Sequence, residues 1–116
     1  MAITKPTAAG ASPQDTYLEL FDKYILRDGA SDLRKWLLES DFFTAPASTR
    51  YHGSHAGGLC IHSVNVWNQM VRLLKAYPEI KTNGETVAIT TLLHDLCKID
   101  FYKVDYRNAK NEAGVW

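Results

Sequence analysis

The sequence has few cysteines, no long apolar run and no excess of charge of either sign. Its two cysteines, Cys60 and Cys97, lie among apolar residues and are predicted to be small core residues rather than a disulfide. No segment approaches the roughly 20 apolar residues of a membrane-spanning helix, and the first residues lack the apolar run of a signal peptide. Thirteen basic and thirteen acidic residues cancel, which argues against tight binding of nucleic acid or an anionic membrane. The chain is therefore expected to be cytoplasmic.

Apart from its N-terminal residues, the 116-residue chain is predicted to be one all-α domain. Residues 1–13, rich in alanine, threonine, glycine and proline, are predicted to be a flexible tail, and residues 14–116 to be the helical domain. Helical periodicity predicts four helices. The first covers residues 14–27, the third residues 59–77, and the fourth runs from about Glu85 through His94 and Asp95. The second is short, with an N-cap at Ser31 and with Leu33, Trp36 and Leu37 facing inward. After Phe101 the alternation of apolar and polar residues predicts a short β-hairpin.

The predicted third helix carries a histidine on its apolar stripe. The inward positions follow three- and four-residue steps, at Leu59, His62, Val66, Met70, Leu73 and Tyr77. A connection of only a few residues, 78–84, predicts that the third and fourth helices are antiparallel neighbours. His62 near the start of one helix is then expected to lie beside His94 and Asp95 near the end of the next. Imidazole nitrogen and carboxylate oxygen suit first-row divalent metals, so the three residues predict a metal site.

Each of these residues also has a purely structural interpretation. His62 can be a hydrogen-bonded core histidine, and His94 with Asp95 can be a polar pair that satisfies itself at a helix end. Lys98 can form an ion pair with Asp95 at three-residue spacing. A zinc site that includes the cysteines is disfavoured, because Cys60 and His62 are two residues apart and point to different sides of a helix.

Two motifs together resemble those of the HD superfamily of metal-dependent phosphohydrolases: Gly57-Gly58-Leu59-x-x-His62-Ser63 and Leu92-Leu93-His94-Asp95-Leu96-x-Lys98. The similarity extends from about Asp41 to Trp116 and is greatest with bacterial and phage-associated hydrolases. The resemblance implies an all-α bundle whose ligands are a histidine, a His-Asp pair and a distal aspartate. The first three correspond to His62, His94 and Asp95.

The resemblance implies hydrolysis of a nucleotide or related phosphoester with a divalent metal, for which manganese, iron, cobalt, nickel, zinc and magnesium remain open. Asp95 would hold the metal and orient water, and Lys98 would neutralise the phosphate. Arg50 and His55 are candidates for substrate contact, and His55 also for protonation of the leaving group. His52, nearby, is interpreted as ordinary loop polarity. The expected partner is a small phosphoester, with no membrane.

No residue of the chain corresponds to the distal aspartate, so the sequence looks like the N-terminal portion of a longer domain. The isolated chain is expected to hold metal weakly, to turn over little substrate and to associate with itself. The alternative is a non-catalytic HD-like module that binds a nucleotide or a protein. A nuclease is the third candidate, and the neutral net charge argues against it.

Overall fold

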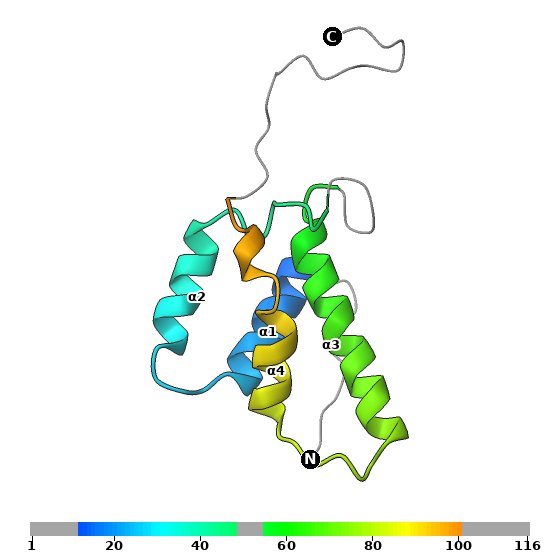
Figure 1. Ribbon diagram of the computed structural model, residues 1–116. Helices are drawn as coiled ribbons and strands as arrows, with labels where there is room; N and C mark the ends of the chain where they lie inside the picture. The colour runs from blue at the N-terminus through cyan, green and yellow to red at the C-terminus, as the bar shows by residue number, and fades with distance from the viewer. Residues whose placement is uncertain (1–11, 49–54, 101–116) are drawn as a thin grey trace, which may run out of the picture.

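The computed structural model describes residues 12–48 and 55–100. Within them the chain forms four α-helices and one short 3-10 helix and has no strand, which confirms the all-α class. The elements are α1 Pro13–Tyr24, α2 Ala30–Glu39, α3 Gly58–Ala76, α4 Gly84–Leu92 and η1 Leu96–Lys98. Helices α1, α3 and α4 pack against one another, and α2 stands to one side of them (Figure 1). None of the helices in the described residues is long and apolar enough to cross a membrane.

Aromatic side chains fill the centre of this bundle. Tyr17 of α1 is fully buried, with its ring centroid 4.7 Å from that of Phe42 and 5.6 Å from that of Phe43. Trp67 of α3 lies against Tyr24, with 4.9 Å between the centroids. The largest fully buried side chains are Trp67, Tyr17, Phe21, Phe42, Leu20, Leu37, Leu59 and Leu92. They come from all four helices and from the segment after α2, so one core holds the described residues together.

Helix α1 begins and ends earlier than the predicted range of 14–27. Ser12 caps it by accepting a hydrogen bond from the Asp15 N–H at 3.1 Å, and Pro13 occupies the first turn, where its missing N–H costs nothing. The helix ends at Tyr24, and just beyond it Glu85 of α4 accepts from the Leu26 N–H at 3.0 Å and from the Arg27 guanidinium. Of the predicted tail, residues 1–13, Ser12 and Pro13 form the start of α1, and the first eleven residues lie outside the described part.

Helix α2 begins at Ala30, so the predicted cap at Ser31 is wrong. Gly29 is the N-cap, in the left-handed conformation with φ of 90°, which glycine adopts without steric cost. Leu37 is fully buried and Leu33 partly buried, as predicted, but Trp36 is 48% exposed.

The buried face of α3 is displaced from the predicted stripe. Its buried residues are Gly58, Leu59, Cys60, Ser63, Val64, Trp67 and Val71, whereas Leu73 and Tyr77 are about half exposed. Ser63 can lie inside because its hydroxyl donates to the Leu59 carbonyl at 3.0 Å. His62 is therefore at the border of the core rather than in it.

The two cysteines have different environments, although both are free thiols. Cys60 is 1% exposed, and burial raises its pKa to about 12. Cys97 lies in η1 and is exposed, so its predicted place in the core is wrong. The predicted β-hairpin after Phe101 lies outside the described residues.

Candidate metal centre

The His94-Asp95 pair lies just beyond a helix rather than within one. Helix α4 ends at Leu92, and the pair forms the turn that leads into η1. The predicted continuation of the helix through Asp95 is therefore wrong. The predicted antiparallel packing of α3 and α4 is confirmed, and it brings the start of α3 next to the end of α4 (Figure 1).

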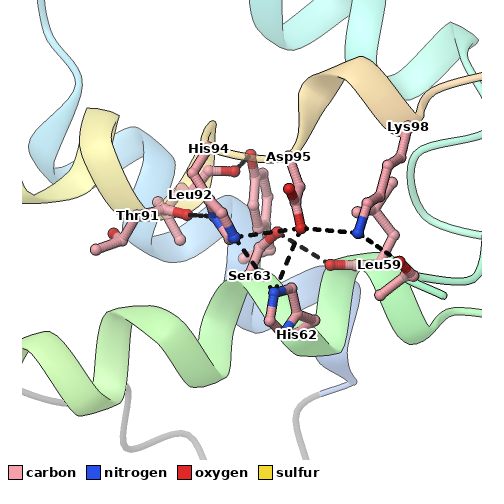
Figure 2. A network of polar contacts seen from close by, with 10 residues as sticks. Leu59, His62, Ser63, Thr91, Leu92, His94, Asp95 and Lys98 are labelled. Carbon is pink, nitrogen blue, oxygen red and sulfur yellow. Dashed lines mark hydrogen bonds and ion pairs between the residues drawn. The ribbon is translucent and has the colours of Figure 1, made fainter. Parts of the chain in front are cut away.

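Three ligand atoms from these two places converge, as predicted. Nε2 of His62, Nε2 of His94 and a carboxylate oxygen of Asp95 all lie within 4.8 Å of one another. The two imidazole nitrogens are 3.2 Å apart, and Asp95 Oδ2 is 3.4 Å from His62 and 3.2 Å from His94 (Figure 2). The three side chains are 18–30% exposed, so the cluster is reached from solvent. This group could hold a metal ion.

A backbone carbonyl determines which nitrogen of His94 is available. Nδ1 of His94 is 2.6 Å from the carbonyl oxygen of Thr91, and because a carbonyl only accepts, Nδ1 carries the hydrogen (Figure 2). In the neutral ring Nε2 is then unprotonated, and its lone pair points toward His62 and Asp95. Metal-ligating histidines generally donate their other N–H to a carbonyl or carboxylate in this way.

The separations also fit a shared ion. With bonds of about 2.1 Å, neighbouring ligand atoms lie about 3.0 Å apart in octahedral and about 3.4 Å apart in tetrahedral coordination. The three observed distances, 3.2, 3.2 and 3.4 Å, fall in that interval. Charge-assisted N–H···O hydrogen bonds are shorter, at about 2.7–2.9 Å. The three distances are therefore compatible with ligands that share one ion, and the distance between the two histidines also fits a hydrogen bond.

Lys98 borders the same cluster from η1. Its Nζ donates to the Ala47 carbonyl at 2.6 Å and lies 3.3 Å from Asp95 Oδ2. The ion pair with Asp95 that the spacing suggested is thus present, and the shorter contact to Ala47 fixes the ammonium group. A positive charge therefore lies beside the three candidate ligand atoms.

Two further contacts hold the turn that carries the pair. The Tyr17 hydroxyl donates to the carbonyl of Leu92, the last residue of α4, at 2.8 Å. Burial raises the pKa of this phenol far above its usual value, so it remains a donor. Beyond η1, the Asp100 N–H donates to Asp41 Oδ1 at 2.9 Å. The segment between Leu92 and Asp100 is therefore attached at both ends.

His55 and His62 line one groove along α3, together with Ile61, Asn65, Val66 and Gln69; its volume is about 450 Å³. His55 is exposed, and its Nδ1 donates to the Ala56 carbonyl at 3.1 Å. The other loop candidate, Arg50, and the neighbouring His52 lie outside the described residues. Neither cysteine belongs to the group of candidate ligands found among the described residues, and the Cys60 thiol donates to the Pro13 carbonyl.

Sequence patterns did not indicate the supporting residues Tyr17, Ala47 and Thr91. Tyr17 had the pattern of a core aromatic residue, and Ala47 and Thr91 contribute backbone carbonyls, which no side-chain motif reports. The groove residues Asn65 and Gln69 share a helix face with His62 at spacings of three and seven residues, which the sequence does contain.

Comparisons of the chain with models of known protein families, with curated proteins and with solved structures each found no match.

Proposed function

We propose that the chain is a metal-dependent phosphohydrolase of the HD type that acts on a nucleotide or a related small phosphoester. The observation that carries the proposal is the convergence of Nε2 of His62, Nε2 of His94 and Oδ2 of Asp95, with His94 Nδ1 engaged by the Thr91 carbonyl. The resemblance of the two motifs to the HD superfamily supplies the reaction class. When bound, a divalent cation would withdraw charge from a phosphoryl oxygen and make water a better nucleophile.

The chain's own residues would have distinct tasks. His62, His94 and Asp95 would hold the ion, and Asp95 would also orient the attacking water. Lys98, fixed by the Ala47 carbonyl, places its ammonium group against the phosphate. His55 lies in the same groove as His62, with the Nδ1 hydrogen directed to Ala56, so Nε2 is its remaining nitrogen for contact with the leaving group.

The second candidate is a non-catalytic module, and one observation favours it. Lys98 already pairs with Asp95, and the two histidines are within hydrogen-bond distance, so the polar groups have partners without an ion. Such a module would keep the cluster as a structural link between α3 and the end of α4.

Metal titration calorimetry with Mn²⁺ and Zn²⁺, followed by an assay with p-nitrophenyl phosphate and mononucleotides, tests both candidates. We expect His94→Ala and Asp95→Asn to lower metal affinity by about 100-fold or more, since even changes behind a ligand cost about 10–100-fold. His55→Ala and Asp32→Asn are the matched controls and should bind metal like the parent chain. Lys98→Ala should keep its metal and lose hydrolysis.

Three outcomes would contradict the proposal. The site is wrong if the parent chain binds neither metal or if Asp95→Asn binds as tightly as the parent. Tight metal binding without hydrolysis of any phosphoester would instead favour the non-catalytic module.

A further inference from the structure

Helix α3 has a second face, next to its core face, that lines a groove. The core face carries Leu59, Ser63 and Trp67, which are buried. The groove face carries Ile61, His62, Asn65, Val66 and Gln69, at steps of three and four residues that place them on one side of the helix. From Gly58 to Gln69 this face extends for about 16 Å.

The groove carries no formal charge along its described lining. Apart from the two histidines, its side chains are the apolar Ile61 and Val66 and the amides Asn65 and Gln69. A polynucleotide is held chiefly by cations along its phosphates, which this lining does not supply. The matching ligand is uncharged, has an apolar surface, and has hydrogen-bond donors and acceptors at an edge.

The groove continues into the metal cluster through His62, which belongs to both. A ligand whose phosphate lies at His62, Asp95 and Lys98 would therefore extend its remaining part along α3. The volume of about 450 Å³ is within the range of about 300–1,000 Å³ typical of small-molecule sites. Asn65 and Gln69 are four residues apart, so their amides lie one helical turn from each other on the same wall.

We propose that this groove binds the nucleoside part of a single nucleotide, and that Asn65 and Gln69 determine which base is accepted. The inference rests on the proposed phosphohydrolase function and adds the orientation of the substrate. A carboxamide presents a donor and an acceptor side by side and pairs with the edge of a base, as asparagine and glutamine do with adenine. Ile61 and Val66 contact the apolar faces of the ring. The phosphate lies at the metal end, beside Lys98.

Binding of nucleosides to the full chain without added metal tests the groove separately from hydrolysis. Adenosine, guanosine, cytidine and uridine are titrated by calorimetry, with ribose 5-phosphate as the probe that lacks a base. We expect at least one nucleoside to bind and ribose 5-phosphate to bind much more weakly. Asn65→Ala and Gln69→Ala should each lower the nucleoside affinity by about 10-fold and change the ranking of the four bases.

The matched control is Gln14→Ala, an exposed glutamine of α1 that does not line the groove. Because Asn65 and Gln69 are exposed, their replacement leaves the core intact, and helical content measured by circular dichroism checks this. The inference is overturned if no nucleoside binds at millimolar concentration, or if the double variant binds all four with unchanged affinity and ranking. Nucleoside binding without any phosphohydrolase activity would instead count against the proposed function alone.

Discussion

The hydroxyl of Tyr17 connects the aromatic core to the end of α4, and its removal has a calculable cost. Tyr17→Phe keeps the ring in contact with Phe42 and Phe43 but removes the hydrogen bond to the Leu92 carbonyl. A buried acceptor left without a partner costs about 1–3 kcal/mol. For a domain of this size, a loss of about 2 kcal/mol corresponds to a fall in Tm of about 8–16 °C.

Urea denaturation followed by circular dichroism measures this cost. We expect the midpoint to fall while the slope with denaturant stays the same, because the surface exposed on unfolding does not change. Tyr77→Phe is the matched control, since Tyr77 is 52% exposed and should lose little stability. Equal midpoints for Tyr17→Phe and the parent chain would refute the buried hydrogen bond.

The alkaline range gives a second check with a definite sign. Burial holds the pKa of folded Tyr17 above its unfolded value of about 10, so the stability it contributes is complete below pH 10 and falls as the pH rises beyond it. At pH 11 the phenol of the unfolded chain is about ten parts ionised to one part neutral. This ionisation stabilises the unfolded state and lowers the free energy of unfolding by about 1.4 kcal/mol. Tyr17→Phe has no such phenol, so the difference in free energy of unfolding between the parent chain and Tyr17→Phe should become smaller by about 1.4 kcal/mol at pH 11. A deficit that is constant from pH 7 to 11 would show that the phenol is open to solvent.

Two further predictions concern the thiols and the contact between α1 and α4. A thiol reagent at pH 8 should label the exposed Cys97 rapidly in the folded chain. It should reach Cys60, whose pKa burial raises to about 12, only after denaturation, and rapid labelling of both thiols would contradict the burial of Cys60. The Leu26 N–H and the Arg27 guanidinium lower the pKa of Glu85, so its contribution to stability is present above its unfolded pKa and is lost as the pH falls through its folded pKa. Glu85→Gln should therefore destabilise the chain at pH 7 and have less effect near pH 3 in urea denaturation, and an equal effect at both would be evidence against the contact.

The periodicity of the sequence predicted the helices well but not their ends. The signals at Ser12, Pro13 and Asn83 are local, because each cap acts on its own first turn. The residues just after α1 are instead bound by Glu85, about sixty residues away, and the end of α4 has no glycine or proline to indicate it. Ends that are determined by distant partners leave no local pattern.

The face of α3 shows a second limit. Apolar residues lie on much of the surface of this helix, so Leu73 and Tyr77 were predicted to extend its buried stripe. In the structure the last buried residue of α3 is Val71. Only the positions of α1 and α4 decide which of two adjoining faces is covered. His62 was assigned to the inward stripe but lies at its border, where its nitrogen meets both His94 and solvent.

The early end of α4 is what makes the site. A helix leaves its last carbonyls without backbone partners, and two of them, at Thr91 and Leu92, accept here from His94 Nδ1 and from the Tyr17 hydroxyl. Had the helix continued, these carbonyls would have accepted from the N–H groups of Asp95 and Leu96 instead. His94 would then have lost the partner that directs its Nε2 lone pair at His62. The end of the helix at Leu92, which the sequence did not indicate, therefore orients His94. It also frees the Leu92 carbonyl to accept from Tyr17, seventy-five residues earlier in the chain.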